Sequence, residues 1–304
     1  MPGVSADRER LVAGKRASAP APLPGRERLA AFEARVWEAG ERYGRPDLPW
    51  RYVDDPYAVY VSEAMLQQTQ VARVLSYWPR FLHAFPTIDA LASASTSDVL
   101  EMWQGLGYNR RALALLRTAQ ICARDYAGAM PATAEELEAL PGIGPATAAG
   151  IVAFAYQRPS VYIETNVRAV FIHEFFPDAA DKVSDADLRP LVAATCSRED
   201  ARGWYYALLD WGAQLKKDQV NPSRKAKAYH RQSRFEGSKR QKRSFLLREV
   251  LAQPGVSAAE LHRLLDAEEA SHGREPVDDG AFAAILAEME AEGFFSRDGE
   301  GYRA

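Results

Sequence analysis

The stretch "LPGIGPATAAG", residues 140–150, indicates how the centre of this 304-residue chain is built. Pro141 ends one helix, because proline cannot continue the backbone hydrogen bonding of a helix interior. Gly142 and Gly144 permit a tight turn, and "PATAAGIVAFA" then starts a second helix. Such a turn exposes backbone N–H groups at a helix N-terminus, where phosphate oxygens bind. We therefore predict a helical hairpin that contacts phosphate through Gly142 and Gly144.

Helical segments separated by proline and glycine make up most of the remaining chain. Residues 27–44 carry apolar side chains at helical spacing and end at a glycine. Further helical segments follow up to residue 215, and only the short "SVYI", residues 160–163, reads as a strand. We therefore expect an all-α core over residues 27–215.

The chain ends suggest two additional regions. Residues 1–26 are rich in Ala, Pro, Gly and charge, which predicts a disordered tail. Residues 244–304 contain three short amphipathic helical patterns, followed by a two-strand pattern that turns at Asp298 and Gly299. Three helices followed by a hairpin predict a C-terminal winged-helix-like domain.

The formal net charge of −3 hides a strong asymmetry along the chain. Residues 214–243 hold eleven Lys and Arg against two Asp and Glu, whereas residues 244–304 hold five against thirteen. We interpret residues 216–243 either as a solvated linker or as a phosphate-contact segment. In the second case the contact residues are Lys225, Lys227 and Arg231. The acidic C-terminal region favours a partner-binding or structural role over phosphate contact, and its partner is unidentified.

Several classes of protein are disfavoured by the composition. No apolar run approaches the roughly 18 residues that span a bilayer, and the N-terminus lacks the apolar region of a secretory signal. The two cysteines, Cys122 and Cys196, provide neither a disulfide framework nor metal-ligand spacing. We therefore expect a monomeric cytoplasmic protein that makes no membrane contact.

One stretch is more polar than a core helix requires. "VSEAMLQQTQVARV", residues 61–74, places Glu63, Gln68 and Thr69 among apolar residues at helical spacing. A helix that only filled the core would not need them, so we expect catalytic or binding roles on this single helix.

Five motifs together resemble a known family. In chain order they are "LPWR" (48–51), "PYAVYVSEAMLQQTQV" (56–71), "WQGLGYNRRA" (103–112), the hairpin (140–150) and "ETNVRAV" (164–170). Their order and spacing resemble those of MutY-type adenine glycosylases, within the helix-hairpin-helix superfamily of base-excision DNA glycosylases. The resemblance covers about residues 27–215. It implies a two-lobed helical core, duplex DNA as the partner, and removal of a base.

The expected chemistry uses two carboxylates. Protonating the adenine ring makes the base a neutral leaving group, and a second carboxylate stabilises the oxocarbenium-like sugar and positions water. By resemblance Glu63 is the acid, and its apolar neighbours are expected to raise its pKa. The second carboxylate is Glu164, with Asn166 beside it, where the family usually has Asp. The extra methylene moves the carboxylate by roughly 1.5 Å, and we expect Thr165 to cap the following helix instead of Glu164.

The resemblance also assigns residues that open the duplex and hold the extruded base. The assignments are Gln68 and Tyr108 as a wedge in the base stack, Thr69 and Leu106 as contacts to the opposite base, and Trp50 and Arg51 as the base pocket. Tyr206 stands in this pocket where the family more often has Glu or Gln, so the identity of the target base stays open.

Two features of related enzymes are replaced in this sequence. The lysine that attacks the sugar in lyase-type relatives is absent, because Pro145 and Ala146 occupy its place. Lys216 occupies the place of the first cysteine of an iron–sulfur cluster, so we expect no cluster. The resemblance further implies a monovalent cation, Na⁺ or K⁺, held by the backbone carbonyls of Glu138, Leu140 and Ile143.

The leading hypothesis is therefore a monofunctional DNA glycosylase that removes adenine mispaired with guanine or 8-oxoguanine. One alternative is a glycosylase for another base, such as hypoxanthine, uracil or an alkylated purine. A second alternative, motivated by Glu164, is a non-catalytic DNA-binding protein on a glycosylase scaffold.

Overall fold

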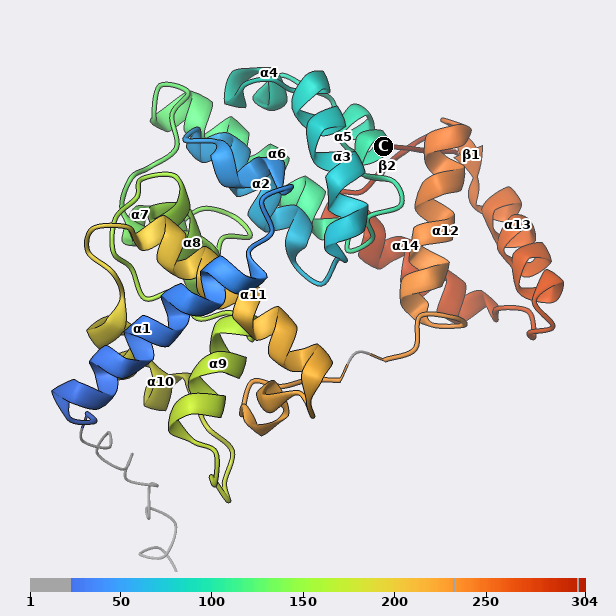
Figure 1. Cartoon of the computed structure of the whole chain (residues 1–304). Helices are drawn as coiled ribbons and strands as arrows, with labels where there is room; N and C mark the ends of the chain where they lie inside the picture. Colours follow the sequence, from blue (N-terminus) through green and yellow to red (C-terminus); the bar gives the residue numbers. More distant parts are fainter. Residues whose placement is uncertain (1–22, 232, 300) are drawn as a thin grey trace, which may run out of the picture.

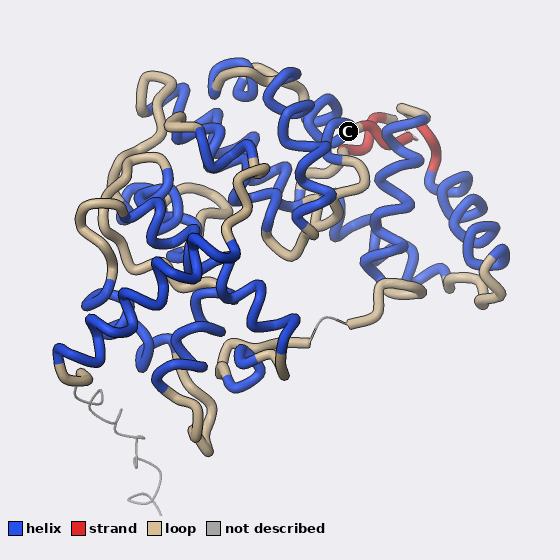
Figure 2. Tube along the Cα trace, in the orientation of Figure 1, coloured by secondary structure: helices blue, strands red, loops and turns tan. Residues whose placement is uncertain are grey.

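The computed structural model of the chain describes residues 23–231, 233–299 and 301–304. Most of the predicted N-terminal tail, residues 1–22, therefore lies outside the described residues. Figures 1 and 2 show helices joined by loops, with named strands confined to the C-terminal region of the described chain. This confirms the predicted all-α core.

The core consists of two lobes. The helices of the first lobe are α2 (Pro56–Leu66), α3 (Val71–Ala84), α4 (Ile88–Ala92), α5 (Thr96–Trp103), α6 (Arg110–Asp125), α7 (Ala134–Glu138) and α8 (Pro145–Phe154). Those of the second lobe are α1 (Arg26–Tyr43), α9 (Thr165–Phe175), α10 (Asp185–Thr195) and α11 (Ala201–Asp218). Helix α11 packs against both α1 and α9, and it also contacts α8 of the first lobe. The two lobes therefore meet where α11 contacts α8.

The predicted hairpin is present between α7 and α8. Gly142 has a φ of +73°, a conformation that side chains other than glycine rarely adopt. A Cβ at this position would lie 2.5 Å from the Cβ of Ala114, so the close approach to α6 also requires glycine. Gly144 is the N-cap of α8, and Pro145 is its first residue. The hairpin prediction is confirmed.

Two local predictions are wrong. The polar stretch around Gln68 is not one helix, because α2 ends at Leu66, a turn follows, and α3 starts at Val71. Gln68 adopts a φ of +54° in that turn, which a continuous helix forbids. The "SVYI" segment is extended but forms no strand, since the backbone N–H of Tyr162 donates to the side chain of Tyr205 (3.2 Å) instead of to a neighbouring strand.

The C-terminal region has the element order of a winged helix. Its elements are α12 (Lys239–Ala252), β1 (Val256–Ser257), α13 (Ala258–Ser271), α14 (Asp279–Glu292), β2 (Ser296–Asp298) and β3 (Gly301–Arg303). The strands form an antiparallel sheet in the order β1-β3-β2, with Tyr302 of β3 paired to both Val256 and Arg297. This confirms the predicted winged-helix-like domain and adds the strand β1, which is too short to produce an alternating pattern.

The basic segment between the core and this domain is not uniform. Its first part extends α11 and forms the 3₁₀-helix η2 (Pro222–Lys225), which packs against α9. The backbone around η2 is tied to the core, because Val183 donates to the carbonyl of Lys225 (2.9 Å) and Lys227 donates to the carbonyl of Val183 (2.7 Å). Its last residues form the start of α12, which Ser238 caps.

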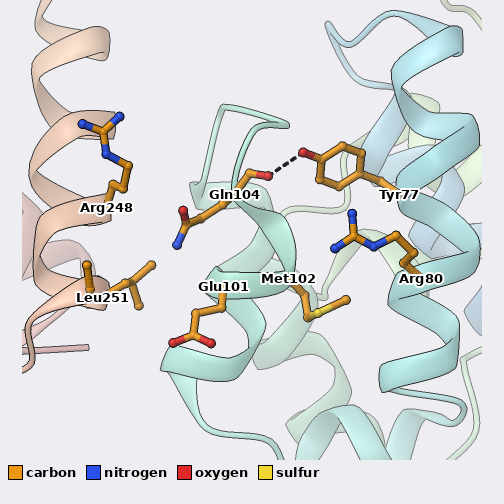
Figure 3. Close-up of a pocket in the computed structure, with 8 residues that line it drawn as sticks. Tyr77, Arg80, Glu101, Met102, Gln104, Arg248 and Leu251 are labelled. Carbon is orange, nitrogen blue, oxygen red and sulfur yellow. Dashed lines mark hydrogen bonds between the residues drawn. The ribbon is translucent and has the colours of Figure 1, made fainter.

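The C-terminal domain docks on the first lobe through α12 and α14. The Arg110 side chain on α6 forms an ion pair with Glu292 at the end of α14 (2.5 Å), and Arg117 donates to the Glu292 carbonyl (2.7 Å). Figure 3 shows a second part of this interface, where Arg248 and Leu251 of α12 face Gln104 across a cavity of about 380 Å³. The domain is therefore held against the core by both its first and last helices.

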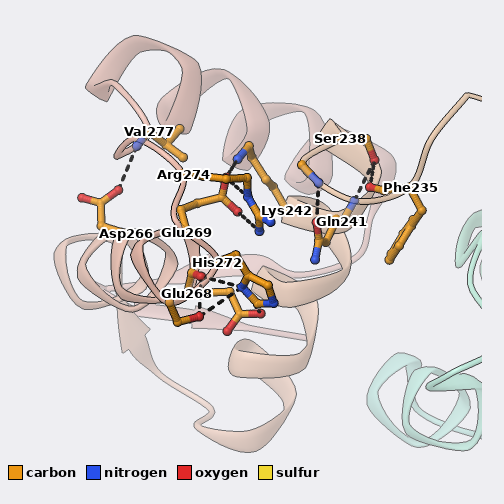
Figure 4. A network of polar contacts seen from close by, with 12 residues as sticks. Phe235, Ser238, Gln241, Lys242, Asp266, Glu268, Glu269, His272, Arg274 and Val277 are labelled. Atoms are coloured by element: carbon orange, nitrogen blue, oxygen red, sulfur yellow. Dashed lines mark hydrogen bonds and ion pairs between the residues drawn. The ribbon is translucent and has the colours of Figure 1, made fainter.

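A buried carboxylate ties the C-terminal domain together (Figure 4). Glu269 of α13 is 2% exposed, and it accepts two hydrogen bonds from Arg274 (2.7 and 3.0 Å) and forms an ion pair with Lys242 of α12. These partners, Arg274 first, lower the pKa of Glu269 to about 2, although burial acts against them. The charged form stabilises the domain above the ordinary glutamate pKa, and this stabilisation is lost as the pH falls towards 2.

None of the helices in the described part of the chain has both the length and the apolar character that a membrane crossing needs.

Candidate active site

Helix α2 places an acidic residue inside the core. Pro56 occupies the first turn, and the side chain of Asp55 caps the helix by accepting from the backbone N–H of Tyr57 (3.0 Å). Most of the residues that follow are buried, because α2 packs against α3, α6 and α8. Glu63 is an acidic residue within this helix and keeps only part of its surface exposed.

The surroundings of Glu63 favour its protonated form. They raise its pKa to about 8, and the largest cause is burial, followed by the negative charge of Glu164. The Tyr162 hydroxyl donates to Glu63 Oε2 at 3.3 Å, which stabilises the charged form and acts in the opposite direction. At neutral pH most Glu63 side chains therefore carry a proton, in agreement with the raised pKa expected from the sequence.

The carboxyl group of Glu63 is enclosed by the helix that follows the hairpin. A Cβ added to Gly150 on α8 would lie 2.8 Å from Glu63 Oε2 and 3.0 Å from Cε2 of Tyr162. Side-chain Cβ atoms essentially never come within 3.0 Å of such atoms. Glycine at this position is therefore needed to admit the carboxyl group, a requirement that the hairpin motif did not reveal.

The second carboxylate caps a helix, which corrects a prediction. The Glu164 side chain, and not that of Thr165, accepts the backbone N–H groups of Asn166 and Val167 at the start of α9. Glutamate is a weak N-cap by statistics, but its longer side chain folds back far enough here to reach both donors. Glu164 thus remains close enough to Glu63 to influence its pKa.

Lys216 supports the residue beside this carboxylate. Its Nζ donates to Asn166 Oδ1 at 2.7 Å, which links the end of α11 to the first turn of α9. Burial lowers the pKa of Lys216, and the charge of Glu164 acts against this effect. The sequence marked Lys216 only as a replaced cysteine, and its contact with Asn166 could not be read from residues 50 positions apart.

The predicted base-pocket residues are held in a fixed arrangement. Trp50 is buried and packs edge-to-face on Trp78, with ring centroids 6.2 Å apart. Both terminal nitrogens of Arg51 donate to the buried carboxylate of Asp210 (2.7 and 2.6 Å), and its guanidinium lies 4.4 Å from the ring of Tyr206. No role was predicted for Asp210. The signal available in the sequence was an acidic residue four positions after Tyr206, one helical turn along α11.

Tyr206 forms the wall of this region between the two lobes. Its ring stacks on that of Phe154, with centroids 4.7 Å apart and an interplanar angle of 5°. Burial, followed by the charge of Glu63, raises its pKa, so the side chain is a neutral phenol. A neutral phenol therefore stands close enough to Glu63 to feel its charge.

The predicted wedge residues lie in two neighbouring turns. Gln68 and Tyr108 both adopt left-handed backbone conformations, with φ values of +54° and +48°. Such conformations are unfavourable for residues with side chains and persist when surrounding contacts enforce them. Thr69 shares the first turn with Gln68, and Leu106 shares the second with Tyr108. Leu106 is only 3% exposed, so its side chain is packed into the protein.

Arg111 joins the two turns. It lies within the motif at residues 103–112, but no role was predicted for it. Its guanidinium donates to the carbonyls of Ala64 (2.8 Å), Met65 (2.9 Å), Gln67 (2.6 Å) and Gly107 (2.9 Å) and to the hydroxyl of Thr69 (3.1 Å). These bonds satisfy carbonyls that the end of α2 leaves without intrahelical partners. Burial lowers the pKa of Arg111 to about 10, so the group stays charged at neutral pH.

The two turns and the C-terminal domain enclose a cavity of about 1000 Å³. We call this space the wedge groove. Its lining includes Gln68, Leu106 and Tyr108 of the core and Arg240, Arg243 and Phe294 of the C-terminal domain. The groove combines amide, aromatic and guanidinium groups, which suit a nucleic-acid strand.

The predicted phosphate contacts differ in accessibility. Lys227 and Arg231 are exposed, whereas Lys225 is half-buried and donates to the carbonyl of Pro177. Gly142 and Gly144 of the hairpin are exposed. The hairpin and the exposed basic residues are therefore accessible to a ligand. Lys225 instead stabilises the fold through its hydrogen bond to Pro177.

The predicted cation ligands lie in the turn of the hairpin. Glu138 is the last residue of α7. The carbonyl of Leu140 accepts the backbone N–H of Ile143 at 3.3 Å, which closes a turn between these residues. Within the described ranges, no group of three or more His, Cys, Asp or Glu side chains could hold a metal ion.

Part of the chain is similar to known DNA repair proteins. Residues 61–193 match the model of the HhH-GPD superfamily of base excision DNA repair proteins. The adenine DNA glycosylase of Mycobacterium tuberculosis is 41% identical over 170 residues, covering 55% of this chain and 56% of the relative. The adenine DNA glycosylase of Buchnera aphidicola is 34% identical over 171 residues, covering 56% of this chain and 49% of the relative. The chain thus spans about half the length of the curated relatives it matches.

Solved structures agree in fold. A thermostable thymine-DNA glycosylase superposes with a TM-score of 0.57 at 20% identity, covering 64% of this chain and 91% of that structure. A non-covalent endonuclease III–DNA complex superposes with a TM-score of 0.51 at 17% identity, covering 60% and 84%. Residues 61–193, which match the HhH-GPD model, contain the hairpin and both carboxylates, and these solved structures share the fold of the core.

Proposed function

We propose that this protein is a monofunctional DNA glycosylase that removes adenine mispaired with guanine or 8-oxoguanine from duplex DNA. The observation that carries the proposal is an enclosed glutamate, Glu63, whose pKa of about 8 keeps a proton available at neutral pH beside a second carboxylate, Glu164. The similarity of the core to curated adenine DNA glycosylases supports adenine as the target.

In this mechanism Glu63 donates its proton to a ring nitrogen of the extruded adenine. The bond between the sugar C1′ and the base nitrogen then breaks, and its electron pair leaves with the now neutral base. The sugar becomes oxocarbenium-like, and the negative charge of Glu164 stabilises it. Water adds to C1′ and loses a proton to a carboxylate, which completes the hydrolysis.

The support around Glu164 suits this role. The backbone N–H of Asn166 donates to the carboxylate of Glu164, and the side chain of Asn166 accepts from Lys216. These two bonds hold the carboxylate in position at the N-terminus of α9. The helix N-terminus stabilises negative charge close to Glu164, whereas burial favours the protonated form of Glu63. Two carboxylates in different environments can thereby divide the acid and the stabilising roles.

DNA would meet three parts of the molecule. Gln68 and Tyr108 would enter the base stack, with Thr69 at the opposite base. Leu106, whose side chain is buried, would support the turn that carries Tyr108. The hairpin glycines and the exposed Lys227 and Arg231 would contact phosphates. A Na⁺ or K⁺ ion at the hairpin carbonyls would add positive charge to the same phosphate site. Acting on duplex DNA would place the protein at the nucleoid.

The reaction is proposed to stop at base removal. The first turn of α8 begins with Pro145 and Ala146, which carry no amine that could attack the sugar. Strand breaks should then appear only after alkali treatment. The second candidate function, removal of another base, rests on Tyr206, because a phenol recognises a different set of base edges from a carboxylate or an amide.

The test is single-turnover base release from a panel of duplexes. The panel contains adenine opposite G, 8-oxoguanine, C and T, together with hypoxanthine and uracil substrates, and the Glu63→Gln protein serves as the control. Adenine release from the G and 8-oxoguanine pairs alone supports the proposal. Release of a different base moves the specificity to the second candidate. No release from any duplex, despite binding, would leave a non-catalytic DNA-binding protein.

A further inference from the structure

Arg240 lies in the C-terminal domain but its side chain ends in the core. It is the second residue of α12, and its Nη1 donates to the hydroxyl oxygen of Tyr108 at 2.7 Å. Its guanidinium carbon also lies 5.6 Å from the centre of the Tyr108 ring. The two residues are 132 positions apart, so this contact depends on the docking of the domain.

The guanidinium of Arg240 is itself fixed in place. Its Nη2 donates to the backbone carbonyl of Ser233 (2.7 Å) and to the hydroxyl of the same residue (3.2 Å). The Phe235 ring lies 5.9 Å from the guanidinium carbon. Because both terminal nitrogens are engaged, the group that meets Tyr108 is held in one orientation.

Tyr108 is contacted by a second guanidinium from the core. Arg111 lies 5.5 Å from the centre of the same ring, and its Nε donates to the Tyr108 carbonyl at 3.4 Å. Tyr108 keeps a left-handed backbone conformation that tyrosine does not favour. A residue in this state needs surrounding contacts to enforce it, and Arg240 contributes the contact from outside the core.

The docking of the domain fixes the position of this contact. Glu292 at the end of α14 pairs with Arg110, two residues after Tyr108 (2.5 Å), and also with Arg243 of α12 (2.7 Å). One carboxylate thus joins the start of α6 to the same turn region of α12 that carries Arg240. The wedge groove remains open beside these contacts, with a volume of about 1000 Å³.

We propose that Arg240 is a positioning residue that holds Tyr108 ready to enter the DNA, so that the winged-helix-like domain takes part in opening the base pair. The proposal rests on the proposed glycosylase function. It assigns the acidic C-terminal domain a role in base extrusion, which its net charge alone argues against. The domain presents three basic residues to the wedge groove, Lys239, Arg240 and Arg243, against one acidic residue, Glu288. Glu288 pairs with Lys239 and Arg243, so the guanidinium of Arg240 is left to contact Tyr108.

The experiment follows base extrusion directly, using the full-length protein and a duplex with 2-aminopurine at the target position. Its fluorescence rises when the base leaves the stack, whether or not it is later cleaved. The variants are Arg240→Gln, Tyr108→Phe and the double variant. Arg263→Gln is the matched control, since Arg263 lies in the same domain and bears the same charge but is exposed and pairs with Glu260 on α13. Circular dichroism checks that each variant is folded.

We expect Arg240→Gln to slow extrusion about tenfold, which corresponds to the loss of one charge-assisted hydrogen bond. Tyr108→Phe should slow it similarly, and the double variant should be little slower than either single variant, because the two residues act through one contact. On a duplex whose target faces an abasic site, where no pair must be opened, the effect of Arg240→Gln should largely disappear. Arg263→Gln should match the unmodified protein.

Three results would overturn the proposal. The first is unchanged extrusion in a folded Arg240→Gln protein. The second is faster extrusion, which would make the contact a restraint on Tyr108. The third is a loss from Arg240→Gln that is equally large whether or not the Tyr108→Phe substitution is also present. Failure of the proposed function is recognised separately, since 2-aminopurine extrusion can be measured even if no base is released.

Discussion

The region around Glu63 and the wedge groove shift the pKa of a glutamate in opposite directions. Glu63 is enclosed by the core, and its burial together with the charge of Glu164 raises its pKa to about 8. At the wedge groove, Glu292 pairs with Arg110 and Arg243, and the pKa of this carboxyl group is lowered, chiefly by Arg110. The first environment keeps a glutamate protonated and reactive, whereas the second uses a charged glutamate as a structural link.

The two regions also differ in how they are assembled. The Glu63 region is built from core residues, with Glu63 on α2, Gly150 on α8 and Tyr162 between α8 and α9. The wedge groove is shared between two core turns and a domain that follows a long basic segment. Changes in the Glu63 region should therefore alter the chemical step at constant DNA affinity. Changes at the groove should alter DNA binding and base extrusion at a constant chemical step.

The largest expected effect comes from Glu63→Gln. The amide keeps the volume of the side chain but has no proton to transfer to the base, so base release should fall by roughly 10³-fold. DNA affinity should be nearly unchanged, because the wedge turns and basic residues remain. Single-turnover release and binding by fluorescence anisotropy measure the two quantities. Near-normal release would show that another group is the acid.

Gly150→Ala should come next, with a loss of about 100-fold in base release. The new Cβ would lie 2.8 Å from Glu63 Oε2, so the carboxyl group must move away from its position. Gly25→Ala is the control, since a Cβ there meets nothing within 4 Å. If both alanine variants release base at the normal rate, the enclosure of Glu63 by α8 does not contribute to catalysis.

At the wedge groove, Arg111→Met should weaken DNA binding and slow extrusion by about tenfold. The variant loses the bonds that hold both wedge turns, and each bond to a charged group contributes about 1.5–3 kcal/mol. Arg124→Met removes the same charge from the exposed end of α6, where the partner is Asp125, and should have little effect. A loss confined to the chemical step on the abasic-site duplex would contradict the division between the regions.

The pH dependence of base release gives a smaller effect. Glu63 is the active acid when protonated, so release should fall about tenfold per pH unit above the pKa of about 8. Tyr162→Phe removes a hydrogen bond that stabilises the charged form, so the pKa should rise and the decline should shift to higher pH. A profile that shifts to lower pH, or stays in place, would show that this bond does not set the pKa.

The smallest effect is expected for the exposed basic residues. Replacing Lys227 and Arg231 with Gln should reduce the salt dependence of DNA binding by about 0.9 per lost phosphate contact. Arg263→Gln, which removes an exposed charge paired with Glu260 on α13, is the control. An unchanged slope in the double variant would show that this segment is a solvated linker and belongs to neither region.

Features set by neighbouring residues could be predicted from the sequence, whereas features set by residues distant in the sequence could not. The hairpin, the helical core, the winged-helix-like domain and the position of Glu63 on a buried helix could be predicted, because proline, glycine and apolar spacing act over a few neighbouring residues. The break after Leu66 could not, since it depends on Arg111, which lies 44 to 47 residues from the α2 carbonyls that it caps. The cap by Glu164 was mispredicted because an average preference is outweighed by one favourable side-chain geometry.

Local sequence therefore determines which elements form and where the acidic residue stands. The tertiary structure decides how that residue behaves, because its pKa depends on Tyr162, 99 residues away, and on burial by separate helices. It also decides that Asp210 holds Arg51 and that Arg240 meets Tyr108, over separations of 159 and 132 residues. Hydrogen bonds and charges act over a few ångströms of space, and separation along the chain carries no information about that distance until the chain has folded.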